Sequence, residues 1–67
     1  MNLKQLKQEF KTLTIPKTLK INETTYNDLQ YAIDSLIVVL ESNAGNRGYL
    51  AYYEKLLSIY KQLKSKQ

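Results

Sequence analysis

The sequence predicts an all-α fold: a small three-helix protein in which an antiparallel helical hairpin, about 22–43 and 46–65, joins an N-terminal amphipathic helix, about 2–13. Two observations support this prediction. Apolar residues recur at intervals of three and four along these three segments, which is the period of an α-helix. The chain has only 67 residues, so it is expected to form a single domain, 1–67, with one small core.

The first predicted helix carries a narrow apolar stripe. Its members are spaced by three, four and three residues: Leu3, Leu6, Phe10 and Leu13. This is the a/d spacing of a helix that packs along one seam. Pro16 has no backbone N–H donor and cannot continue the helix. Residues 14–21 alternate in polarity and are rich in β-branched side chains, so we interpret them as an extended connector, with a short strand as the alternative.

The second predicted helix begins at Asn22, because Asn is a preferred N-cap and Ile21 with Tyr26 matches a hydrophobic staple. Its broad apolar face identifies it as the core helix, and this face contains Tyr26, Leu29, Ala32, Ile33, Leu36, Ile37, Val39 and Leu40. A short turn at 43–46, with Gly45 in the capping position, is expected to end this helix and to make the third helix antiparallel to it.

The third predicted helix has a wider apolar face than one neighbouring helix covers. Its seam consists of Tyr49, Tyr52, Leu56, Ile59, Tyr60 and Leu63. Leu50, Tyr53 and Leu57 extend this seam sideways to nearly half of the helix circumference. We therefore expect the third helix to contact the first helix as well as the second.

Charge alternates in three blocks along the chain. Residues 1–20 carry five lysines and one glutamate, residues 21–43 carry four carboxylates and no basic residue, and residues 44–67 carry five basic residues and one glutamate. An acidic middle helix that packs against two basic helices reduces self-repulsion. The basic pI of about 9.4 is therefore weak evidence for nucleic-acid binding.

The composition excludes most catalytic chemistry. The chain has no cysteine and no histidine, which removes disulfides, thiolates, zinc fingers and imidazole catalysis. Asp34 and Glu41 are seven residues apart on one helix face, about 10 Å, which is too far to share a proton or a metal ion. We expect no enzymatic activity, no catalytic residue, no metal site and no cofactor. The absence of a signal peptide and of a transmembrane segment favours a cytoplasmic protein with no membrane partner.

A second apolar stripe is expected on the second helix, on the side opposite its core face. Tyr31 and Val38 are seven residues apart there, and Asp34 lies beside them. This stripe is a candidate contact patch, and the alternative is that the first helix packs over it. The candidate partner-binding residues are Tyr31, Asp34, Val38, Tyr53 and Leu57.

The lysines of the terminal helices support three interpretations: a solvated face, a phosphate-binding ridge or a membrane-surface helix. The candidate nucleic-acid ligands are Lys4, Lys7, Lys11, Lys61 and Lys64. The narrow stripe of the first helix, without tryptophan, gives little burial in a membrane. The chain has a single arginine, so bidentate base readout is nearly excluded and only nonspecific phosphate contact remains.

The runs Tyr31–Leu36 and Tyr53–Tyr60 resemble the helical hairpins of short proteins from phages and mobile elements of Gram-positive bacteria, over about 22–66. The resemblance implies a small accessory protein that acts by binding a larger one. Our leading hypothesis is therefore a protein-binding regulator or inhibitor with a protein partner. The alternatives are a nonspecific nucleic-acid-binding protein and a structural subunit of a larger assembly. The apolar excess of the helices also predicts a homodimer at micromolar concentration.

Overall fold

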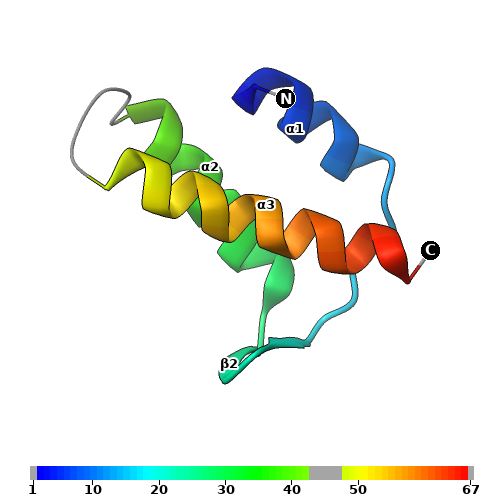
Figure 1. The fold of residues 1–67 in the computed structure, drawn as a ribbon. Helices are drawn as coiled ribbons and strands as arrows, with labels where there is room; N and C mark the ends of the chain where they lie inside the picture. The colour runs from blue at the N-terminus through cyan, green and yellow to red at the C-terminus, as the bar shows by residue number, and fades with distance from the viewer. Residues whose placement is uncertain (1, 43–47, 67) are drawn as a thin grey trace.

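The computed structural model, which describes residues 2–42 and 48–66, contains three helices and one β-hairpin (Figure 1). In chain order the elements are α1 (Leu3–Lys11), β1 (Leu19–Ile21), β2 (Thr24–Tyr26), α2 (Leu29–Ser42) and α3 (Tyr49–Ser65). The all-α prediction is therefore wrong. The protein is mostly helical, but residues predicted as a connector and as the start of the second helix form a two-stranded antiparallel sheet.

The hairpin turns at Asn22 and Glu23. Asn22 has a φ of 56°, in the left-handed region that asparagine adopts more readily than most residues. Leu19 pairs with Tyr26 across the two strands, and β1 contacts α3. Leu19 is buried in the core, and its pairing with Tyr26 requires residues 24–26 to be extended and not helical.

The second helix begins at Leu29, seven residues later than predicted. Asp28, and not Asn22, caps it: the Asp28 Oδ1 accepts a hydrogen bond from the backbone N–H of Tyr31 at 3.2 Å. The backbone N–H of Leu29 donates to the carbonyl oxygen of Lys17 at 2.9 Å, which ties the connector to the start of α2. The predicted cap and hydrophobic staple are wrong because their residues form the hairpin.

The N-terminus of α1 is stabilised by a capping box between Asn2 and Gln5. The backbone N–H of Gln5 donates to Oδ1 of Asn2 at 2.8 Å, and the backbone N–H of Asn2 donates to Oε1 of Gln5 at 2.9 Å. The helix ends at Lys11, two residues before the predicted end. The predicted turn at 43–46, with its glycine cap, lies outside the described residues, and the third helix is described from Tyr49 onward.

One core joins all the elements. Its buried side chains are Leu6, Phe10, Leu19, Leu29, Ile33, Leu40, Leu56, Ile59, Tyr60 and Leu63. Figure 1 shows α2 and α3 running in roughly opposite directions, with α1 on one side of α3 and the hairpin on the other. The predicted contact between the first and third helices is confirmed. The placement of Tyr52 in the buried seam is wrong, because this side chain is 41% exposed.

Candidate functional site

Tyr31 and Val38 form an exposed stripe on α2, which we call the α2 stripe. Their side chains are 70% and 59% exposed, on the side of the helix opposite its buried residues. The first helix does not cover them. It packs beside the stripe instead, where Nζ of Lys7 lies 2.8 Å from Oε2 of Glu41. The stripe predicted from the sequence is therefore a solvent-exposed feature of the folded chain.

A groove of about 550 Å³ lies next to the α2 stripe, between α2 and the segment formed by the end of α1 and the connector. We call it the α1–α2 groove. Its apolar lining residues are Phe10, Leu13, Ile15, Ile33, Ile37 and Val38. Val38 belongs to both features, so the apolar surface is continuous from the stripe into the groove. Such a concave apolar surface is the usual form of a binding site.

The rim of the α1–α2 groove is polar and carries charges of both signs. Its polar lining residues are Lys7, Lys11, Gln30 and Asp34. Lys7 is paired with Glu41, and Oδ1 of Asp34 accepts a hydrogen bond from Nε2 of Gln30 at 3.0 Å. Within the described residues, Lys11 has no ion-pair partner. The groove can therefore bury apolar side chains at its floor and orient a charged group at its edge.

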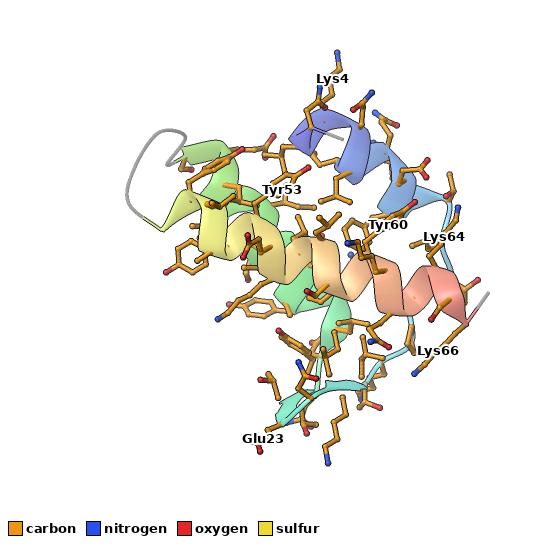
Figure 2. All side chains as sticks on the ribbon, viewed as in Figure 1. Lys4, Glu23, Tyr53, Tyr60, Lys64 and Lys66 are labelled. Carbon is orange, nitrogen blue, oxygen red and sulfur yellow. The ribbon has the colours of Figure 1, made fainter. Side chains whose placement is uncertain are left out.

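Two predicted partner-binding residues lie elsewhere. Tyr53 and Leu57 are on α3, where both side chains are half-buried against the core and neither lines the groove. Tyr53 stacks on Tyr49, with ring centroids 6.3 Å apart, and Figure 2 shows it on the side of α3 that faces α1. The five candidates therefore do not form one patch: α2 carries three of them, and α3 carries the other two.

The candidate nucleic-acid ligands fall into two groups. Lys4, Lys7 and Lys11 follow α1, whereas Lys61 and Lys64 are on α3. Figure 2 shows Lys4 projecting from the start of α1. It shows Lys64, which belongs to α3, near the end of α1. Nζ of Lys64 lies 4.0 Å from Oε1 of Glu9, so both groups include a lysine beside a carboxylate.

Glu9 and Tyr60 fix α1 against α3, a role that the sequence did not reveal. The Tyr60 hydroxyl donates a hydrogen bond to Oε1 of Glu9 at 2.8 Å, and the Tyr60 and Phe10 rings pack edge to face with their centroids 5.7 Å apart. This hydrogen bond, followed by burial and by the negative charge of Glu9, raises the pKa of Tyr60 above its ordinary value of 10.0. Because Phe10 also lines the groove, this contact positions one groove wall.

The groove residues that sequence reasoning missed are Leu13 and Ile15, together with the inward-facing Phe10, Ile33 and Ile37. The last three were correctly placed on core faces by their helical spacing. Leu13 was assigned to the apolar stripe of the first helix and Ile15 to the connector, whereas in the structure both residues follow the end of α1. Across residues 2–42 and 48–66, no cluster of three or more carboxylates is suited to hold a metal ion, and no helix is long and apolar enough to cross a membrane.

Comparison with known proteins identifies one family. A family model described as Domain of unknown function (DUF6965) matches residues 1–65. No curated protein and no solved structure matches the chain. The match covers both walls of the groove and the whole α2 stripe.

Proposed function

The chain belongs to the DUF6965 family of domains of unknown function, and we propose that it is a small protein-binding regulator that acts by binding a larger protein. The binding site in this proposal is the α1–α2 groove together with the α2 stripe. The observation that carries the proposal is the continuity of the two: an apolar groove of about 550 Å³ opens beside Val38, which is itself 59% exposed.

The energetics of apolar burial support this proposal. Fully burying one large apolar side chain contributes about 1.5–3 kcal/mol. Tyr31 and Val38 do not make this contribution to the folding of the isolated chain, because both remain exposed. Tyrosine also supplies a large contact area with few rotatable bonds, which suits it to protein interfaces. A partner that covers both residues and fills the groove gains binding free energy from burying apolar surface that stays exposed in the folded chain.

The test is a comparison of two tagged variants in affinity purification from the native host. One variant carries Tyr31→Asp and Val38→Asp, and the control carries Leu50→Asp on α3, where Leu50 is 68% exposed and does not line the groove. We expect the wild type and the control to retain the same protein partner and the double variant to lose it, with circular dichroism unchanged in all three. Retention of the partner by the double variant would contradict the proposal.

Nucleic-acid binding by the lysines of α1 is the competing outcome of this test. If the chain instead captures nucleic acid at low salt, and this capture survives the double substitution but is lost with Lys4→Glu and Lys11→Glu, the binding function belongs to the basic flank of α1. Binding through phosphate contacts should then fall steeply as salt is raised, because counterions return to the nucleic acid.

A further inference from the structure

The α2 wall of the groove has the geometry of a helix-packing surface. Its residues are Gln30, Ile33, Asp34, Ile37 and Val38, at positions i, i+3, i+4, i+7 and i+8. This pattern is one continuous strip along α2, about two turns or 12 Å long. An element that lies alongside α2 for two turns therefore contacts the whole wall.

Backbone hydrogen bonding distinguishes a helix from an extended segment as the occupant. The residues of the α2 wall lie inside a continuous helix, where backbone N–H and C=O groups pair with one another. Neither described strand contributes a residue to the groove, so no sheet edge is present there for strand addition. Against α2 an extended segment would leave the backbone groups on that side unpaired, whereas a helix brings its own hydrogen bonds.

Charge at the rim determines which helix fits. Glu41 already neutralises Lys7, and the amide of Gln30 already donates to Asp34. Lys11 is exposed at the rim and, among the residues described, has no ion pair. A hydrogen bond from a neutral amide leaves the negative charge of Asp34 in place on the α2 wall, so the unpaired positive charge of the rim is that of Lys11, on the α1 wall. A carboxylate on the partner complements it and sets the orientation of the partner in the groove.

We propose that the α1–α2 groove binds an amphipathic α-helix of the partner protein, with its apolar face in the groove and an Asp or Glu of its polar border opposite Lys11. This inference rests on the proposed function and specifies the partner. The recognition mode is helix-in-groove, in which anchors at i, i+3 or i+4, and i+7 enter the apolar floor.

A peptide selection tests this inference directly. The probe is a displayed library of unconstrained peptides about 16 residues long, enough for four helical turns, selected on the immobilised full chain and on its Lys11→Glu variant. We expect the wild type to enrich apolar residues at helical spacing with an acidic residue at one flanking position. The Lys11→Glu variant should enrich Lys or Arg at that same position. A selected acidic peptide should bind the variant about fivefold more weakly, which corresponds to one exposed ion pair.

Two controls separate this result from general charge effects. Lys61→Glu changes an exposed lysine on α3 that does not line the groove, and it should leave the enriched pattern unchanged. Val38→Asp should abolish binding of every enriched peptide, because it places a charge at the edge of the groove.

Three results would overturn the inference. They are enrichment of proline-containing or otherwise non-helical peptides, an enriched charge that Lys11→Glu does not reverse, and failure to enrich any peptide that depends on Val38. Light scattering gives a fourth: a dimer that Val38→Asp converts to a monomer would assign the groove to a second copy of the chain. In each case the proposed function is judged separately, by whether the native partner is lost with the Tyr31→Asp and Val38→Asp variant.

Discussion

The first helix meets its two neighbours in different ways. Against α3 the contact is closed: Phe10 packs on the Tyr60 ring, and the Tyr60 hydroxyl donates to Glu9. Against α2 the contact leaves the α1–α2 groove, with an ion pair between Lys7 and Glu41 at its edge. We infer that α3 holds α1 in place, so the groove is a fixed feature and does not depend on tight packing along the α2 side.

The largest expected effect comes from breaking the closed side. Phe10 is buried and packs on the Tyr60 ring, so Phe10→Ala should lower the free energy of unfolding by about 3–5 kcal/mol, measured by urea denaturation. The matched substitution on the open side, Val38→Ala, should change it by no more than about 0.5 kcal/mol, because Val38 is exposed. Equal losses from the two variants would contradict the distinction between a closed and an open side.

The buried faces of α1 and α3 are the part of the fold that the sequence predicts best. Leu6 and Phe10 on α1, and Leu56, Ile59 and Leu63 on α3, were assigned to apolar seams and are buried. Helical spacing is sufficient here because each of these helices presents its main apolar face to the core. Tyr52 fits the same spacing but is exposed, because a periodic pattern does not show how far along the helix its neighbours extend.

The hairpin could not be assigned from local signals alone. Both Asn22 and Asp28 are good N-caps, and each is followed by a plausible apolar face. In the structure Leu19 is buried, pairs with Tyr26 and lies on a strand that contacts α3. This is a tertiary contact, and it overrides the helical pattern that begins at Asn22. The alternation of residues 14–21, interpreted as an extended connector with a short strand as the alternative, was the local indication of β1, and the strand alternative is confirmed for Leu19–Ile21.

The candidate site shows the same division. The exposure of Tyr31 and Val38 follows from their position opposite the core face of α2, so the sequence predicts it. The groove depends on where α1 ends and on how the connector with Leu13 and Ile15 returns toward α2, which no periodicity encodes. The self-association predicted from the apolar excess stays a prediction. Its basis is reduced, because the main apolar faces of α1 and α3 are buried within one chain.

A smaller effect should come from the polar part of the closed side. Because the pKa of Tyr60 is raised in the folded chain, the unfolded chain loses this proton first as pH rises. The contribution of Tyr60 to the free energy of unfolding should therefore be fully present below about pH 10. It should be lost as pH rises through the raised pKa of Tyr60. Tyr60→Phe has no such proton and should lack this part of the pH dependence in urea denaturation at pH 9 to 11. An identical decline in both proteins would show that the hydrogen bond to Glu9 does not stabilise the contact.

The smallest expected effect concerns the ion pair on the open side. The Lys7 and Glu41 side chains are 36% and 48% exposed, so solvent screens their attraction. A double-mutant cycle with Lys7→Ala and Glu41→Ala should give a coupling of about 0.2–1 kcal/mol at low salt, as exposed pairs do. This coupling should approach zero in about 1 M salt, where the Debye length is near 3 Å. A coupling well above this range, or one that persists at high salt, would mean that the ion pair holds α1 against α2 as firmly as α3 does. The contact between α1 and α2 would then be as firm as the contact between α1 and α3. The contrast between the two sides of α1 would not hold.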